Sequence, residues 1–349
     1  MELRIYDAEL NLKGITENQR SIVWTRRYFE AGEFEITLPI TDDNIRLYQL
    51  GNIVSFRNTV EAGVIEDIQL SQSNIERTLS ARGRFLASYM DRRLIRPTIN
   101  FSGKVEVAMR TLLTGAVSIP LVELGELMGY DDTVEFQATY KNLLDFETKL
   151  SKSANIGFRF RPDFTEKVIY FDTFKGLDRT RNQTDRAFVE FSDKFDNINK
   201  SVYRDNDQLL KTVGYVGGEG EGSARTYVVV GDDTLTGLER RELFVDAKDI
   251  SSDDITQQEY LAALAERGNQ YMEEHIRSSS MECETIPSGN YNYLTDYDLG
   301  DVVTVRNTQW GIYQDLRITE ITEVYEYGNA VIQPTLGSAL PTKMTWEDK

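Results

Sequence analysis

Apolar and polar side chains alternate regularly in the first hundred residues. Between Glu33 and Pro39 every second residue is apolar, and these residues are Phe34, Ile36 and Leu38. A two-residue period is typical of a strand that buries one face. Because such strands recur at hairpin spacing, we expect an antiparallel barrel or sandwich here. The further elements expected are strands at 54–56, 64–68 and 75–79 and a short helix at 85–90.

The spacing of apolar residues becomes helical after residue 100. Apolar residues between Val105 and Leu112 are three or four positions apart, and a run of leucines predicts a helix over 140–153. This change of period indicates a separate, small α+β domain. The strands expected after the helix lie at 157–161, 167–174 and 187–191.

The clearest helix in the sequence runs from about Gln257 to His275. Thr256 is placed to cap its first turn, and Glu259, three residues later, completes a capping box. Gly268 interrupts the apolar face of this helix. Since glycine costs about 1 kcal/mol relative to alanine inside a helix, we expect close packing against another backbone at that point.

Two ten-residue segments, 50–59 and 299–308, resemble each other closely. They read LGNIVSFRNT and LGDVVTVRNT, and after one deleted residue the match resumes between 63–70 and 311–318. We interpret this as one supersecondary unit used twice. Each Leu-Gly step would be a turn that leads into a strand, and each later glycine would sit in the following hairpin turn. The residues expected to be equivalent in the two copies are Leu50, Gly51, Gly63, Asp67, Leu299, Gly300, Gly311 and Asp315.

The alternative is that two ordinary β-hairpins converged on similar sequences. With the repeat, the pattern predicts a mainly β protein with α+β insertions. It would contain two related antiparallel β-barrel domains and a small α+β domain. The expected domains are a first barrel over 1–98, the α+β domain over 99–200, and a second barrel over 201–349 with a helical insertion at about 251–280.

Charge excludes several classes of function. The chain of 349 residues carries 57 acidic and 39 basic side chains, a formal net charge of −18. We therefore expect no specific binding of nucleic acid, which requires Lys and Arg to displace counterions from phosphates. An anionic membrane surface is disfavoured for the same reason. The chain begins with a charged segment and has no apolar run of bilayer length, so no direct membrane insertion is expected.

Candidate catalytic and metal-binding groups are few. Cys283 and His275 are the single cysteine and histidine, which excludes an internal disulfide and zinc sites built on two histidines. The segment 296–301, with Asp at its first, third and sixth positions, lacks the glycine and glutamate of a calcium loop. The pairs Asp131–Asp132, Asp232–Asp233 and Asp253–Asp254 look like loop and cap acids. We expect no catalytic residue, no cofactor and no metal.

A glycine-rich run at 217–222 has the composition of a phosphate-binding loop but not its chemistry. No Lys-Ser or Lys-Thr follows it, and its two glutamates would repel a phosphate. The run is better explained as a long hairpin tip, because glycine adopts turn conformations without steric cost.

Several motifs occur in a fixed order over nearly the whole chain: 26–39 (RRYFEAGEFEITLP), 61–66, 83–93, 216–222, 240–242, 297–301 and 317–321. Their order and spacing resemble those of the Gp37-like tail proteins of long-tailed phages of Gram-positive hosts. That family is similar to the baseplate hub of contractile phages.

The resemblance implies a homotrimer whose two barrels per subunit alternate around a channel and form a pseudo-sixfold ring. Such a hub, in a phage or phage-derived particle, would connect the tail-tube or distal tail ring to a fibre, spike or lysin. It would also line the passage for DNA and the tape-measure protein. The expected location is the tail tip of the virion, after assembly in the bacterial cytoplasm. The chain ends soon after the second repeat, which argues against an attached wall-degrading module.

Two other functions stay open: a tail-borne peptidoglycan hydrolase that uses paired carboxylates, and a carbohydrate-binding protein that contacts the host surface. The net charge predicts an acidic channel wall that repels DNA, although it could serve only to keep the exterior soluble. Three arginine pairs would then face subunit contacts or the rim of the core: Arg26/Arg27, Arg92/Arg93 and Arg240/Arg241.

Overall fold

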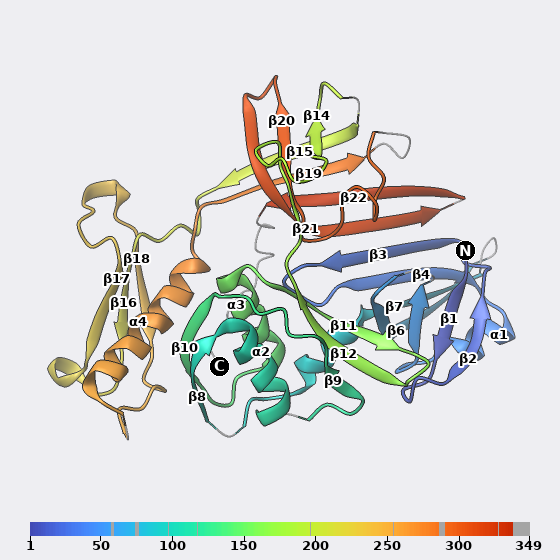
Figure 1. Ribbon diagram of the computed structural model, residues 1–349. Helices are drawn as coiled ribbons and strands as arrows, with labels where there is room; N and C mark the ends of the chain where they lie inside the picture. The colour runs from blue at the N-terminus through green and yellow to red at the C-terminus, as the bar shows by residue number, and fades with distance from the viewer. Residues whose placement is uncertain are drawn as a thin grey trace.

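The computed structural model describes residues 1–56, 59–73, 77–96, 98–116, 118–195, 197–253, 255–285, 290–326 and 328–337. Arg57 and Asn58 of the first repeat, residues 75–76 of an expected strand, and Asp254 lie outside this part. The predicted mainly β fold is confirmed, since most elements belong to antiparallel sheets. The largest sheet has 14 strands and is built from both ends of the chain. Figure 1 shows its N-terminal strands in blue beneath its C-terminal strands in red.

The N-terminal part of the large sheet has the alternation predicted for it. Phe34, Ile36 and Leu38 all point into one core, where they pack with the fully buried Trp24. The elements of this part are β1 (Leu3–Tyr6), β2 (Leu12–Thr16), β3 (Ser21–Arg27), β4 (Glu33–Pro39), α1 (Asp42–Leu47), β5 (Ile53–Phe56), β6 (Ala62–Gln72), β7 (Arg77–Phe85) and a 3₁₀ helix, Leu86–Arg92.

A layer of helices and short sheets follows and packs against the first part. The helix predicted at 140–153 is α3, which Asn142 caps at its start and Asn155 ends in a left-handed conformation. The core of this layer also takes Tyr6, Ile53 and Val64 from the N-terminal strands, so the two parts share one apolar interior. Its elements are β8 (Ile99–Lys104), α2 (Val105–Thr111), a π-helical turn (Leu112–Ala116), β9 (Val122–Leu124), β10 (Thr133–Ala138), α3 (Leu143–Ala154), β11 (Gly157–Asp163) and β12 (Val168–Phe174).

The C-terminal strands complete the large sheet around a third core, which contains the buried Cys283. They are β13 (Asp178–Arg179), β14 (Glu190–Ser192), β15 (Ile198–Asn206), β19 (Ser278–Thr285), β20 (Val302–Asn307), β21 (Ile312–Glu326) and β22 (Asn329–Gly337). The domain limits expected at 98 and 200 remain a prediction.

A small lobe is inserted between β15 and β19, at the left of Figure 1. It consists of a sheet of β16 (Val213–Gly217), β17 (Tyr227–Gly231) and β18 (Glu242–Asp246), covered by α4 (Gln257–Glu273). Both bonds of the predicted capping box are present at the start of α4. The glycine-rich run connects the β16–β17 hairpin, as expected.

Close packing at Gly268 is observed, but against strand side chains and not against a backbone. A Cβ at this position would lie 2.5 Å from Cγ2 of Val216 and 2.9 Å from Cγ2 of Val230. Among the described helices, none is long and apolar enough to cross a membrane.

Glu147, on α3, should make stability depend on pH. It is completely buried, and neither carboxylate oxygen has a hydrogen-bond partner among the described residues. Burial raises its pKa well above the usual value. Because the folded state then binds this proton more tightly than the unfolded chain does, the free energy of unfolding should rise as pH falls towards about 4.5.

The Glu147→Gln variant removes this charge while keeping the side chain's shape. We expect its free energy of unfolding at pH 7–8 to exceed that of the wild type by roughly 1–3 kcal/mol, and its pH profile to be flatter. Urea unfolding between pH 5 and 8 measures both, with exposed Glu123→Gln as control. A profile identical to the wild type would contradict a buried, unpartnered carboxylate.

Candidate assembly interface

The repeated segments form two β-hairpins of the same kind. Each Leu-Gly step is a turn that leads into a strand: Gly51 has a φ of +85° before β5, and Gly300 a φ of +92° before β20. The N–H of Gly51 donates to the carbonyl of Ile65 at 2.9 Å, and that of Gly300 donates to Ile318 at 2.8 Å. These bonds identify Ile65 and Ile318 as equivalent.

This equivalence differs from the second block of the sequence match, which aligned Ile65 five residues earlier, with Tyr313. The β20–β21 hairpin is longer than the β5–β6 hairpin, so the second strand is displaced along the chain. A β-bulge supports the new alignment, since it follows Ile65 in β6 and Ile318 in β21. Asp67 therefore corresponds to Glu320 and not to Asp315.

The two later glycines also play different roles. Gly311 lies in the hairpin turn, with a φ of +67°. Gly63 was expected in the corresponding turn, but it lies inside β6. Its missing side chain makes room for a ring, because a Cβ there would be 2.3 Å from Cε1 of Phe34. Gly63 is thus explained by packing and not by turn geometry.

The duplication extends well beyond the hairpins. The first copy has the strand order β3-β4-β7-β6-β5, and the second has β15-β19-β22-β21-β20. Each neighbouring pair in both series is antiparallel. Five strands of each copy therefore correspond, although the sequence match covers only two of them. The inserted lobe separates β15 from β19, which hides the correspondence in the sequence.

The two copies are joined edge to edge by β3 and β21. These strands pair antiparallel from Arg27 opposite Glu320 to Ser21 opposite Glu326, and Figure 1 shows them side by side. We call this pairing the internal joint. It makes the two copies parts of one continuous sheet.

A buried ionic network surrounds Arg26, a residue of β3 at the internal joint. Arg26, only 2% exposed, pairs with Glu61 at 3.1 Å and with Asp298 at 2.6 Å. Its guanidinium also donates to the Tyr293 hydroxyl at 2.8 Å, and that hydroxyl donates to Glu323 at 2.9 Å. Burial raises the pKa of Glu323, while the hydrogen bonds from Tyr325 and Tyr293 and the charge of Arg26 oppose this rise. Segments from both copies and the loop before β20 therefore converge on Arg26.

The other arginines of the three pairs also have acidic partners or contacts within the chain. Arg27 bonds Glu320 across the internal joint at 2.8 Å, and Arg92 pairs with Glu66 at 3.0 Å. Orientation towards a subunit contact stays a prediction for these, but it is wrong for Arg26, which is buried inside its own subunit. The remaining contacts are Arg93 to the carbonyl of Arg92, Arg240 to Asp233 and Glu242, and Arg241 to Asp207.

Two acids of the second copy, Asp301 and Asp315, hold neighbouring segments in place. Asp301 accepts from the N–H of Leu177 at 2.7 Å and pairs with Arg179 at 2.8 Å. Asp315 accepts from Thr304 at 2.7 Å. In the first copy, Asp67 is exposed and lies 3.7 Å from its nearest arginine, Arg82. These contacts explain Asp301 and Asp315 as structural groups.

Several of the described candidate acids are each held by a different cation. Asp131 and Asp132 bond different lysines, Lys104 and Lys175, and Asp298 is held by Arg26. Among the described residues, no three His, Cys, Asp or Glu side chains are grouped so that they could hold a metal ion.

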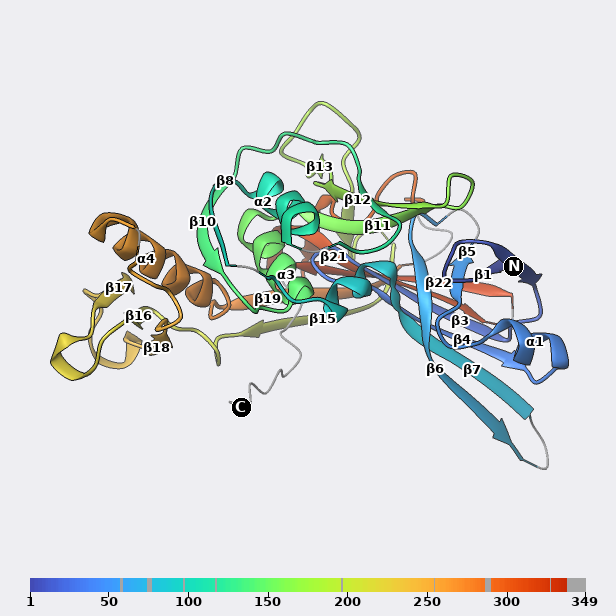
Figure 2. The same ribbon diagram turned by 90° about the horizontal axis from the view of Figure 1, so that it is seen from below.

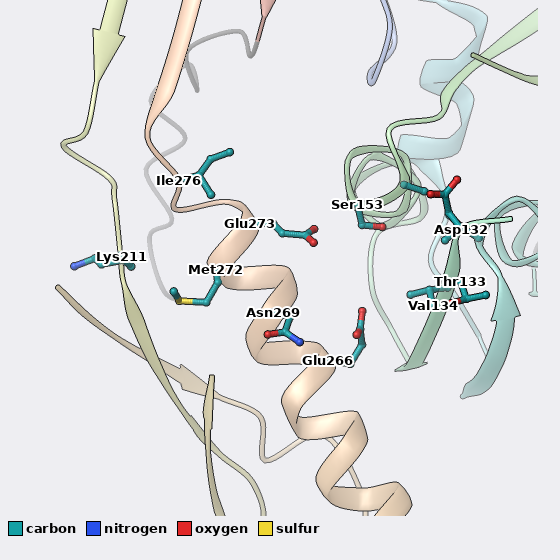
Figure 3. Close-up of a pocket in the computed structure, with 12 residues that line it drawn as sticks. Asp132, Thr133, Val134, Ser153, Lys211, Glu266, Asn269, Met272, Glu273 and Ile276 are labelled. Atoms are coloured by element: carbon teal, nitrogen blue, oxygen red, sulfur yellow. The ribbon is translucent and has the colours of Figure 1, made fainter. Parts of the chain in front are cut away.

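A cavity of about 500 Å³ lies between α4 and the helical layer. Figure 3 shows Glu266 and Glu273 extending from α4, with Ser153 and Asp132 across the space. Burial raises the pKa of both glutamates, and neighbouring acids add to the effect. The cavity is lined by three acids, several other polar side chains and apolar side chains, with Lys211 as the single cation among its lining residues. It is a gap between the lobe and the helical layer.

The fold is that of phage tail proteins. A tail protein from Neisseria meningitidis MC58 superposes with a TM-score of 0.60 at 16% identity, and the match covers 96% of each chain. The 43 kDa tail protein of prophage MuSo2 from Shewanella oneidensis gives 0.58 at 13% identity, covering 96% of this chain and 98% of that one. Prophage tail protein gp18 from Listeria monocytogenes EGD-e gives 0.57 at 13%, covering 97% and 95%.

The sequence agrees with this class. The family model of the Siphovirus ReqiPepy6 Gp37-like protein matches residues 2–338, and the chain belongs to that family. No curated protein sequence matches the chain. The resemblance seen in the order of the sequence motifs is thereby confirmed.

The paired turn glycines offer a matched test of the repeat. Gly51→Ala adds a Cβ with no atom within 4 Å, so only the left-handed backbone is strained, at about 1–2 kcal/mol. Gly300→Ala adds the same strain, but its Cβ would lie 2.6 Å from the Tyr28 ring. We expect it to lose roughly 1–3 kcal/mol more. Urea unfolding of both variants measures the difference, and equal losses would contradict the packing at Gly300.

The network behind the internal joint should be sensitive to the loss of Arg26. Arg26→Met leaves Glu61 buried without its partner, and we expect the free energy of unfolding to fall by about 3–5 kcal/mol. The control is Arg82→Met, which breaks a half-exposed pair with Glu35 and should cost at most about 1 kcal/mol. The double variant Arg26→Met/Glu61→Leu should recover part of the loss. Similar losses for Arg26→Met and Arg82→Met would contradict a desolvated network.

Proposed function

We propose that this protein is the structural hub of a phage or phage-derived tail tip, assembled as a closed ring of three subunits. The observation that carries the proposal is the five-strand unit that occurs twice in each chain with the same strand order. Three chains with two units each give six similar units around one axis. Such a ring has exact threefold symmetry, because it contains three identical chains, and approximate sixfold symmetry, because each chain contributes two similar units.

A ring of this kind can join components of different symmetry. Its pseudo-sixfold face suits a tail-tube or distal tail ring, and its threefold insertions suit a fibre, spike or lysin at the tip. The lobe of β16–β18 and α4, inserted in one copy only, is an example of a feature repeated three times. Assembly in the bacterial cytoplasm and location at the virion tail tip complete the proposal.

The channel of this ring would be acidic. Three chains carry three times the net charge of −18, and Arg26, Arg27 and Arg240 are each paired with an acid of the same chain. A wall poor in free cations does not hold DNA by counterion release, so DNA and the tape-measure protein could pass. A calculated potential of the assembled ring that is basic along the channel would contradict this part of the proposal.

The enzymatic alternative, a peptidoglycan hydrolase with paired carboxylates, has less support. Of the described candidate acids, Asp131, Asp132 and Asp233 are bonded to cations, and Asp232 accepts from the N–H of Thr234. Glu266 and Glu273 line the cavity beside α4. Zymography on cell walls tests it directly, with a known lysozyme as the positive control. A cleared band from the purified chain would favour the hydrolase, and Glu266→Gln and Glu273→Gln would then be the first variants to compare.

The subunit count is open to direct measurement. One chain has a mass of 40.0 kDa, so we expect light scattering behind a sizing column to give three times that mass at high protein concentration. Negative-stain electron microscopy of the same fraction should show rings with a central hole. A dimer, or a monomer at every concentration, would contradict the proposal for the free protein.

A further inference from the structure

We propose that the ring closes by strand pairing between β6 of one subunit and β15 of the next, in the same register as the internal joint. The inference rests on the proposed trimer for the number of subunits. The pairing itself is argued from the duplicated strands and their open edges. The occupant of each open edge is thus a second copy of this chain.

The internal joint uses only half of a long strand. The first half of β21 pairs with Val302–Asn307 of β20. Beyond the bulge, the second half of β21, Glu320–Glu326, pairs with β3. The strand thereby passes from one partner to another along the same edge.

β6 is built in the same way but has half of its edge uncovered. Its first residues, Ala62–Val64, pair with β5. Beyond the bulge, Asp67–Gln72 pair with β7 on one side, and no described strand pairs with the other side. Figure 2 shows this half of β6 projecting with β7 from the body of the molecule. Leu70, within it, is 56% exposed.

β15 provides the matching edge at the other end of the sheet. It corresponds to β3 in the strand order, yet among the described strands it pairs with β19 alone. β3, in contrast, has β4 on one side and β21 on the other. An uncovered edge strand presents backbone groups that can pair with another chain.

Ladders of directly opposed residues give the register. Ile65 lies opposite Gly83, Gly83 opposite Phe34, and Phe34 opposite Trp24. The equivalent ladder of the second copy runs Ile318, Leu336, Met281, Tyr203. Tyr203 therefore takes the place of Trp24.

At the internal joint, Trp24 lies opposite Glu323. Counted from the bulge, Glu323 corresponds to Leu70. The register thus places Leu70 of one subunit opposite Tyr203 of the next. The pairing would extend from Asp67 opposite Asn206 to Gln72 opposite Ser201.

The side chains suit this register. The exposed side chain of Leu70 would become buried against the half-buried ring of Tyr203. A cross-strand pair of an aromatic and an aliphatic side chain is stabilising. Arg204, whose present partner Glu282 is 3.9 Å away, would lie diagonally from Asp67, a distance that long side chains span. The contact is therefore complementary in both apolar surface and charge.

The contact is also directional. Each subunit offers β6 to one neighbour and β15 to the other, which is a head-to-tail interface. It closes into a ring if the rotation between subunits repeats that of the internal joint. The open edges of β6 and β15 are then both covered, so neither is left for uncontrolled association.

Cysteine cross-linking of the full chain tests the register. Cα atoms of directly opposed residues in an antiparallel pair lie about 4.5–5.5 Å apart, within the range of Cα separations that a disulfide spans. The matched variant is Leu70→Cys/Tyr203→Cys, and the control is Leu70→Cys/Val202→Cys, whose second cysteine faces the other side of the sheet. Under mild oxidation, we expect the matched variant to give covalent dimers and trimers on a non-reducing gel and the control to give at least tenfold less. The native Cys283 is buried and present in both.

A second variant tests the pairing without cross-linking. Leu70→Lys would bury a charge against Tyr203, and we expect it to shift the sizing-column mass from trimer to monomer. Leu12→Lys is the control, because Leu12 is similarly exposed on the edge strand β2. A trimer that survives Leu70→Lys and gives no matched cross-link overturns the strand pairing and leaves the hub proposal standing. Cross-linked products of more than three chains from the Leu70→Cys/Tyr203→Cys variant would overturn the trimer and support the pairing.

Discussion

The edge-to-edge pairing of β3 with β21 is the constraint on which the rest of this structure depends. It joins strands from opposite ends of the chain, and without it each copy of the five-strand unit would be a separate sheet with an uncovered edge. The buried network around Arg26 makes the pairing specific. A desolvated guanidinium is tolerated only where its partners are placed correctly, and here the partners come from β3's own copy, from the loop before β20, and through Tyr293 from β21. A shift in register would leave several of these charges without a partner.

The lobe of β16–β18 and α4 and the helical layer are attached to the two five-strand units at different places. β3 and β4 are joined by a short connection, whereas the equivalent strands β15 and β19 are separated by the lobe of β16–β18 and α4. The helical layer after β7 shares its apolar core with the first copy. Each chain therefore presents two similar sheets with different attachments. In the trimeric ring proposed above, a nearly sixfold inner frame would carry threefold features, which would suit a junction between a tube and a tip.

Several carboxylates of this acidic chain hold its own segments in place. Asp301 fastens the segment around Leu177 and Arg179, and Glu61 neutralises Arg26. Glu106 accepts from the backbone N–H groups of Met128, Gly129 and Tyr130. Carboxylates that are already bonded in this way are poor candidates for acid–base chemistry. This use of the acids is consistent with a protein whose task is assembly.

Local patterns in the sequence determined the secondary structure. The alternation around Phe34 produced β4, the capping box at Thr256 began α4, and the Leu-Gly steps at Gly51 and Gly300 produced turns, because each depends on residues close in the chain. Only the tertiary structure decided the alignment of β6 with β21, the packing role of Gly63 and the burial of Arg26. Hairpin length displaces a strand without changing its two-residue period. The space beside Gly63 is set by Phe34, which lies on a different strand, and the partners of Arg26 include Asp298, 272 positions further along the chain. Neither contact can be read from the local pattern.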